Sequence, residues 1–356
     1  MENNKKQKKK NRKPLYILAV FFVIFGFFIY LISRPSPEDT AKTELASAYT
    51  KENVKAIWEK YKPRLHDDEN FLFAVRTKLS SLSLNEEEIK ECIKWLPPAP
   101  ISLNIIVVPD LSRRIVLIPG QIDSDKKVLD AIWASFVTSC GLKKNSHDSL
   151  IIDVTDKHQA GGDFEQIANN LRFDLSNHQG KSNRLFFTDD LSEQYRKSIN
   201  SMYQFASGKS LGADYHLYFR QYLEPLIKKN DLFITYKNKV IVLTDGYLEP
   251  ETETAYTKIK DYKHILYPAV RNGNIEQVIE DNNLCIPPAR INLSETEVLI
   301  CEVFERQDGE GKDKEILEAY WKLWLKRMGV KNPVFIEHQK ASSSTSEIIK
   351  KFISSK

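Results

Sequence analysis

The sequence has few of the residue patterns that mark enzymes and metal proteins. Its seven histidines form no His-x-His or His-x-x-x-His pair, so a zinc hydrolase is not expected. It has no Gly-x-x-x-x-Gly-Lys-Ser/Thr phosphate loop and no Cys-x-x-Cys pair, which disfavours a nucleotide-binding loop, a zinc ribbon and a redox dithiol. The expected state of its cysteines is a buried free thiol, with a disulfide left open: Cys92, Cys140, Cys285 and Cys301.

The net charge of +4 hides an uneven distribution. Seven Lys and Arg residues lie within the first 13 positions, so the rest of the chain carries a net charge of about −3. A basic block this short, directly before an apolar run, is typical of a membrane topology signal. We expect no nucleic-acid partner.

Leu15 to Ile32 is a run of 18 residues without a charge. As a helix it would span roughly 27 Å, close to the hydrocarbon core of a bilayer. A cleaved signal peptide is the rival interpretation, but Ser33-Arg34-Pro35 is a poor cleavage site. The run therefore predicts an uncleaved signal anchor of a single-pass membrane protein. The positive-inside rule places the N-terminus in the cytoplasm and the bulk of the chain outside it, on the periplasmic side of the inner membrane in a bacterium.

The prolines of Pro97-Pro98-Ala99-Pro100 form the clearest boundary after this run. Before them, apolar residues recur at helical spacing, and after them the pattern changes to short apolar runs separated by amphipathic segments. The predicted organisation is a basic cytoplasmic tail (1–14), a transmembrane helix (15–32), a linker with a helical membrane-proximal segment (33–100) and an α/β domain (101–356).

Strands alternate with helices along the predicted domain, which indicates a doubly wound, mostly parallel sheet with helices on both faces. The expected strands are 101–108, 150–154, 184–187, 239–244, 264–267, 297–304 and 333–337. The expected helices are 126–140, 164–171, 191–206, 213–228, 252–261, 274–280, 314–328 and 344–353.

Two of the apolar runs end in polar oxygens. The run from Ile105 to Val108 is followed by Asp110 and Ser112, and the run from Val240 to Leu243 is followed by Asp245. Ligands of open α/β sheets bind outside the carboxyl ends of the strands. If these two strands are neighbours, the three side chains converge at one edge of the sheet.

These segments resemble the von Willebrand factor type A family, whose members carry Asp-x-Ser-x-Ser after the first strand and a Thr-Asp-Gly-like segment after the fourth. Here the first element reads Asp110-Leu-Ser-Arg-Arg114 and the second Thr244-Asp-Gly246. The best match to the family's middle loop is Ser210-Leu-Gly-Ala-Asp214, where Ala213 stands in place of a threonine. The resemblance implies a Rossmann-like fold whose rim holds a divalent cation, and the cation takes a carboxylate from a partner protein.

Two departures from the family pattern affect the metal. Arg114 replaces the second serine and Ala213 the threonine, so two oxygen ligands are lost and a permanent positive charge is added. Mg²⁺ prefers about six oxygens. An arginine can instead neutralise a carboxylate pair by direct ion pairing. We therefore expect a degenerate site without a cofactor, and keep Mg²⁺ or Mn²⁺ bound by Asp110, Ser112 and Asp245 as the alternative.

The predicted ligand-binding rim comprises Asp110, Ser112, Arg114, Asp214 and Asp245. No catalytic residue is assigned, because Ser112 lacks the Gly-x-Ser-x-Gly elbow of a hydrolase. The expected function is a membrane-anchored, non-catalytic protein-binding module, an assembly or accessory component that recognises another protein through an acidic residue. The alternatives are a metal-dependent hydrolase or phosphotransferase using Asp110 and Asp245, and a structural component with a relict rim.

Overall fold

The computed structural model describes residues 35–98, 101–141, 143, 146–176, 178, 181–230, 234–249, 255–306, 310–338 and 343–355, with only the backbone of 181–189 and 343. The chain divides into two compact units between Leu84 and Asn85. Among the described residues, no helix has the length and apolar character that crossing a membrane requires. The predicted transmembrane helix, 15–32, lies outside them, and the four-part division of the sequence stays a prediction.

The described residues of the first unit, 35–84, form the helices α2 (Pro37–Ala46), α3 (Lys51–Leu65) and α4 (Glu69–Ser80). Each helix has an N-cap residue whose side chain accepts a hydrogen bond from a backbone N–H of the first turn. These N-cap residues are Ser36, Thr50 and Asp68. Trp58 of α3 stacks on Phe71 of α4 with ring centroids 5.7 Å apart. This aromatic pair is buried and anchors the small core of the unit.

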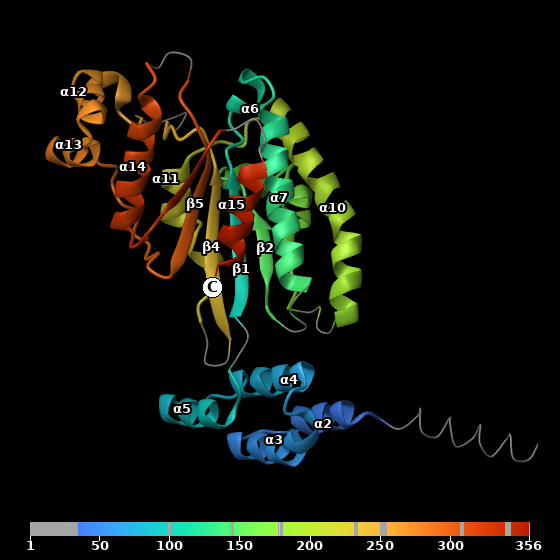
Figure 1. Cartoon of the computed structure of the whole chain (residues 1–356). Coiled ribbons are helices and arrows are strands. Elements are labelled where there is room, and N and C mark those ends of the chain that lie inside the picture. Colours follow the sequence, from blue (N-terminus) through green and yellow to red (C-terminus); the bar gives the residue numbers. More distant parts are fainter. Residues whose placement is uncertain are drawn as a thin grey trace, which may run out of the picture. The chain divides into compact units, whose positions relative to one another are not determined.

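The second unit begins with α5 (Glu86–Trp95) and contains a six-stranded sheet of order β3-β2-β1-β4-β5-β6 (Figure 1). Every strand pair is parallel except β2 with β3. The α/β class and the mostly parallel sheet are as predicted. The strands are β1 (Ile101–Pro109), β2 (Ser149–Ile152), β3 (Arg172–Asp174), β4 (Thr235–Leu243), β5 (Thr296–Val303) and β6 (Val334–Glu337).

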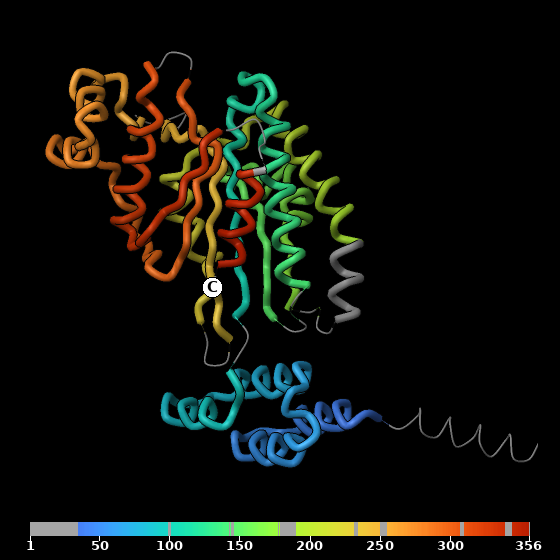
Figure 2. The backbone as a smooth tube through the Cα atoms, viewed as in Figure 1, coloured from blue at the N-terminus to red at the C-terminus, as the bar shows by residue number. Residues whose placement is uncertain are grey.

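Helices cover both faces of this sheet, because two separate apolar cores lie against it. One core involves α7, α10 and α15, and the other α11 and α14. Figure 2 shows α15, in red, beside α7, in green. The helices are α6 (Arg114–Leu117), α7 (Gln121–Gly141), α8 (Lys157–Ala160), α9 (Glu165–Asn170), α10 (Lys181–Gly208), α11 (Tyr215–Gln221), the 3₁₀ turn η1 (Glu224–Leu226), α12 (Ile259–Asn272), α13 (Ile275–Asp281), α14 (Asp313–Arg327) and α15 (Ser343–Ser354).

The central strands β1 and β4 are apolar on both faces. In β1, Ile105 and Val107 enter one core while Ile106 and Val108 enter the other. Each such side chain contributes roughly 1.5–3 kcal/mol when it is fully buried. The continuous apolar run therefore specifies a central parallel strand, as the sequence indicated.

Two predicted strands are wrong. Residues 184–187 lie within α10, and 264–267 lie within α12. Both are short apolar runs of about four residues, for which periodicity does not separate a strand from a helix. The edge strand β3 was not predicted, because three residues carry too little pattern. All four cysteines are free, and Cys92, Cys140 and Cys301 are buried.

Candidate ligand-binding rim

The carboxyl ends of β1 and β4 lie side by side at the centre of the sheet. The two strands pair in parallel register, and the N–H of Asp110 donates to the carbonyl of Leu243 at 2.7 Å. The chain leaves β1 toward β2 on one side, and β4 continues toward β5 on the other. This is the topological switch point, where open α/β sheets bind their ligands. Asp110 and Asp245 are therefore neighbours, as expected, because they follow two adjacent parallel strands.

The loop before α11 joins the same end of the sheet. Leu211 and Gly212 lie against Leu111, and the N–H of Leu211 donates to the carbonyl of Leu111 at 3.1 Å. The three segments chosen from the sequence thus converge. We use the name rim for the residues predicted from them, Asp110, Ser112, Arg114, Asp214 and Asp245.

Arg114, the cationic residue of the rim, is buried. It is 5% exposed, its Nε lies 3.2 Å from a carboxylate oxygen of Asp110, and its Nη2 lies 3.1 Å from one of Asp125. Burial lowers the pKa of Arg114, but the carboxylates of Asp125, Asp110 and Asp245 raise it more, so its pKa lies above the ordinary value. The guanidinium is therefore a fixed charge between carboxylates that would otherwise repel one another.

Asp245 is held by a second arginine. The Nε of Arg306 donates to Asp245 at 3.0 Å, and its Nη1 contacts Glu249 at 2.5 Å. The guanidinium also lies 4.0 Å from the ring centroid of Tyr247. Burial and the neighbouring charge of Asp110 raise the pKa of Asp245. The side chain of Arg306 is 37% exposed, so this arginine reaches solvent whereas Arg114 does not.

The carboxylates of the rim do not fit a divalent cation in this arrangement. One oxygen of Asp110 accepts the N–H of Ser112 at 2.9 Å and the other is the one paired with Arg114. One oxygen of Asp245 accepts the N–H of Tyr247 at 3.2 Å and the other is bonded to Arg306. Each of the four oxygens thus contacts a protein group, and two guanidinium groups lie beside the carboxylates. A divalent cation placed here would be repelled by both arginines.

The side chains of the remaining rim residues accept hydrogen bonds from backbone N–H groups. The Oγ of Ser112 accepts the N–H of Arg114 at 3.4 Å, at the start of α6. Asp214 caps α11, accepting the N–H of Leu217 at 2.9 Å. Ala213 packs against the core beneath α11. Asp214 and Ser112 thus shape the loops on either side of Leu111.

Four residues of this region were not singled out from the sequence: Asp125, Glu302, Arg306 and His338. Glu302 is buried, has a backbone φ of 74°, and accepts a hydrogen bond from Ser124 at 3.0 Å. It also contacts the Nδ1 of His338, and this hydrogen bond raises the pKa of His338. These residues lie at the ends of β5 and β6 and in α7, and only the strand order brings them near Asp110.

A hydrolase-like pentapeptide was overlooked in the sequence. Gly208-Lys-Ser-Leu-Gly212 matches Gly-x-Ser-x-Gly, and Gly212 has a φ of +76°. In a nucleophile elbow this sequence turns sharply from a strand into a helix. Here it follows the long helix α10 rather than a strand. The match therefore lacks the structural context of a nucleophile.

In the part of the chain that the structure describes, no three His, Cys, Asp or Glu side chains are placed to hold a metal ion together. Comparisons with protein-family models, with curated proteins and with solved structures found no match to this chain.

Proposed function

We propose that the second unit is a von Willebrand factor type A-like domain that binds another protein at its rim without a metal ion. The placement of the motif elements supports this. Asp110-Leu-Ser112 follows the first strand of the sheet, Thr244-Asp-Gly246 follows the fourth, and the loop before α11 lies against Leu111.

Arg306 supplies the positive charge in this proposal. In the family a divalent cation accepts the partner's carboxylate. Arg114 is too buried to do so, whereas Arg306 is partly exposed and packs on the ring of Tyr247, which limits its conformers. A guanidinium with donors left toward solvent suits a carboxylate, which it can bind through two N–H groups. The partner is therefore proposed to present an Asp or Glu side chain.

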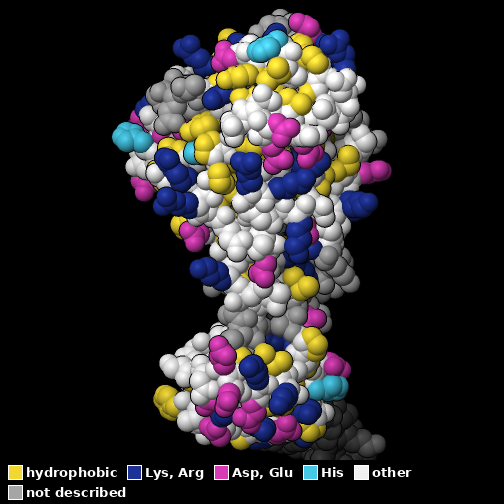
Figure 3. Space-filling model, turned by 90° about the vertical axis from the view of Figure 1, so that its left-hand side faces the viewer, with side chains coloured by type: hydrophobic (Ala, Val, Ile, Leu, Met, Phe, Trp, Pro, Cys, Tyr) yellow, Lys and Arg dark blue, Asp and Glu magenta, His cyan; other side chains and the backbone are white. Residues whose placement is uncertain are grey.

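The observation that carries the proposal is the apolar surface of α6. Val116 and Leu117 are 53% and 72% exposed, one turn after the buried Arg114. Figure 3, which views this unit from the side of α12 and α13, shows hydrophobic side chains exposed singly among charged ones on that face. Apolar side chains beside a charged anchor are typical of a protein-binding surface. Neither side chain belongs to the core, and a bound partner would explain why both apolar side chains are exposed.

We also propose that the apolar run at residues 15–32 is a signal anchor that holds the domain at a membrane, with residues 36–356 outside the cytoplasm. The module then acts as an accessory or assembly component of a membrane complex. A hydrolase or phosphotransferase is less well supported, because Asp110 and Asp245 are each paired with an arginine, whose positive charge opposes a cation beside them.

Site-specific photo-crosslinking in the source cells tests the proposal. A benzoyl-phenylalanine replaces Val116 in the full chain, or the exposed Asn272 of α12 as a matched control. We expect a discrete crosslinked species from position 116, absent from position 272 and lost when Arg306→Glu is added. Crosslinks that are the same from both positions, or that Arg306→Glu leaves unchanged, would refute a rim-mediated partner.

A further inference from the structure

A second candidate site lies at the opposite end of the strands from the rim. There the structure contains a cavity of about 760 Å³ between the starts of β4 and β5, the segment that leads into β6, and α15. Small-molecule sites in proteins have volumes of about 300–1,000 Å³. The cavity is therefore large enough for a metabolite or a lipid fragment.

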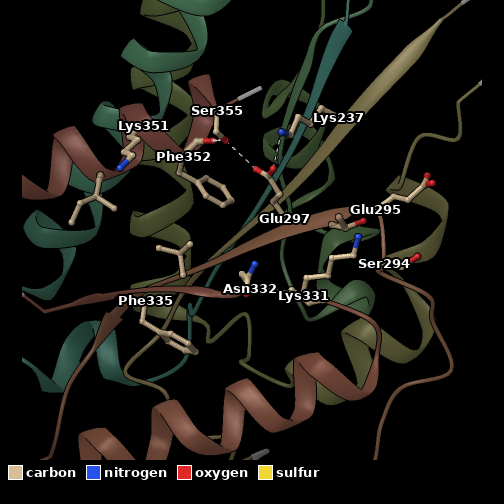
Figure 4. Close-up of a pocket in the computed structure, with 14 residues that line it drawn as sticks. Lys237, Ser294, Glu295, Glu297, Lys331, Asn332, Phe335, Lys351, Phe352 and Ser355 are labelled. Carbon is tan, nitrogen blue, oxygen red and sulfur yellow. Dashed lines mark hydrogen bonds and ion pairs between the residues drawn. The ribbon is translucent and has the colours of Figure 1, made fainter.

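The walls of the cavity are mostly apolar. Among the lining residues Val330 and Phe352 are buried, Val334 and Phe335 are half-buried, and Ile348 of α15 is 38% exposed. In Figure 4 the rings of Phe335 and Phe352 lie on opposite sides of β6, and they belong to different cores of the sheet, so the ring of Phe352 is the aromatic ring on the α15 side. Such a lining favours an apolar body, because it removes apolar surface from water on both sides.

The charged groups around the cavity are mainly basic. Lys237 and the buried Lys239 both pair with Glu297, at 2.7 and 2.5 Å, so this carboxylate is neutralised twice. Glu297 is also bonded by Ser355 at 3.2 Å, and Figure 4 shows this cluster at one end of the hollow.

Two further lysines stand at the mouth. Lys331 and Lys351 are exposed lining residues, and within the described part of the chain neither ammonium group has an ion-pair partner. Glu295 is the other acidic residue of the lining. The lining therefore has three lysines against two carboxylates, and Lys331 and Lys351 are the exposed ones.

We propose that this cavity binds an anionic amphiphile, a molecule with an apolar chain and a carboxylate or phosphate head. The chain lies against Phe352 and Val334, which pack on the same face of the sheet, and the head lies near Lys331 and Lys351. A neutral ligand of the same shape leaves the two ammonium groups unused, so charge and apolar length are both required. This site is separate from the rim and does not depend on the function proposed for it.

Calorimetric titration of the full chain in lipid nanodiscs tests the site, with empty nanodiscs subtracted. The probes are octanoate, octyl phosphate and octanol. We expect saturable binding of at least one of the two anions, at one site per chain, and binding of octanol at least about tenfold weaker. Octanol binding as tight as that of the anions, or no saturable heat from either anion, would overturn the proposal.

Surface variants locate the binding, and all are checked for an unchanged Tm. Lys331→Glu with Lys351→Glu should weaken anion binding by about tenfold or more, and Ile348→Trp should weaken it by filling the mouth. The matched control is Lys350→Glu, an exposed α15 residue outside the lining, which should change affinity less than about twofold. Equal effects of the control and the mouth variants would contradict the assigned position. A preference for octanoate points to a free fatty acid, and one for octyl phosphate to a phosphate ester such as a lipid head group.

Discussion

The Nη2 of Arg114 lies 3.2 and 3.1 Å from the two carboxylate oxygens of Asp125, inside the fold. The same guanidinium is paired with Asp110 at the end of β1. Arg114 thus joins α6, α7 and the carboxyl end of the sheet by charge. Arg114 occupies the position at which the von Willebrand factor type A pattern has a serine, so a guanidinium stands in place of a hydroxyl group.

Replacing Arg114 should destabilise the fold strongly. Arg114→Met leaves Asp110 and Asp125 buried without their cationic partner, which costs about 3–5 kcal/mol of the free energy of unfolding. Urea unfolding of the full chain in nanodiscs measures this. The exposed neighbour gives a matched control, since Arg113→Met should change the free energy by no more than about 0.5 kcal/mol. An equal effect of the two substitutions would show that the ion pair does not stabilise the fold.

Removing Asp125 together with Arg114 should restore part of this loss. The double variant Arg114→Met with Asp125→Leu removes one buried carboxylate and makes both side chains apolar. Replacing a buried ion pair by apolar side chains often leaves the free energy of unfolding unchanged or raises it. We expect the double variant to be more stable than Arg114→Met alone. The four unfolding free energies form a double-mutant cycle, and strict additivity would contradict direct pairing.

Leu117→Asp should abolish the predicted crosslink at the rim without unfolding the domain. Leu117 is 72% exposed, so the change in unfolding free energy should stay within about 0.5 kcal/mol. The added charge replaces apolar contact surface and repels an acidic partner. Photo-crosslinking from position 116 measures the loss, and an undiminished crosslink would show that α6 does not face the partner.

Stability should depend on pH through His338. Its hydrogen bond with Glu302 raises the pKa of His338 in the fold, so the protonated ring stabilises the native state. This contribution is complete below the ordinary histidine pKa of about 6.5 and is lost as the pH rises through the raised value. His338→Gln should therefore lower Tm more at pH 5.5 than at pH 9. His264→Gln, on the exposed surface of α12, is the control and should lower Tm less at pH 5.5. A larger effect of His338→Gln at pH 9 would reverse the assigned sign.

Lys239 should hold the C-terminal helix in place. Its ammonium group is buried and donates to the carbonyl of Phe352 and to the Oγ of Ser355, the latter at 2.7 Å, at the end of α15. Lys239→Met should remove both of these hydrogen bonds, leaving the carbonyl of Phe352 with the bond from Ser355 alone, and increase amide hydrogen exchange across α15. Lys237→Met is the control, because Lys237 also pairs with Glu297 but is less buried. Unchanged exchange in Lys239→Met would exclude this role.

The sequence was most informative where apolar runs were long. β1 and β4 were predicted because both are apolar on two faces, and their carboxyl ends then placed Asp110 and Asp245 at one edge. The predicted adjacency of these two strands is confirmed. The short runs at 184–187 and 264–267 failed, because the surrounding residues extend them into helices.

The partners of the rim carboxylates could not be predicted in full. Asp125 lies in α7, and Arg306 follows β5, 61 residues after Asp245. Neither position carries a motif, and their proximity follows from helix packing and strand order. Arg114 was recognised as a departure from the family pattern, but its pairing with Asp125 required the structure.

The most direct test of a metal-free rim is a calorimetric titration of the full chain in nanodiscs with Mg²⁺ and with Mn²⁺. Asp245→Ala serves as the control that removes a predicted ligand. With all four carboxylate oxygens of Asp110 and Asp245 held by protein groups, we predict no saturable binding in the wild type and no difference from the variant. Saturable binding of either ion that Asp245→Ala abolishes would contradict the account.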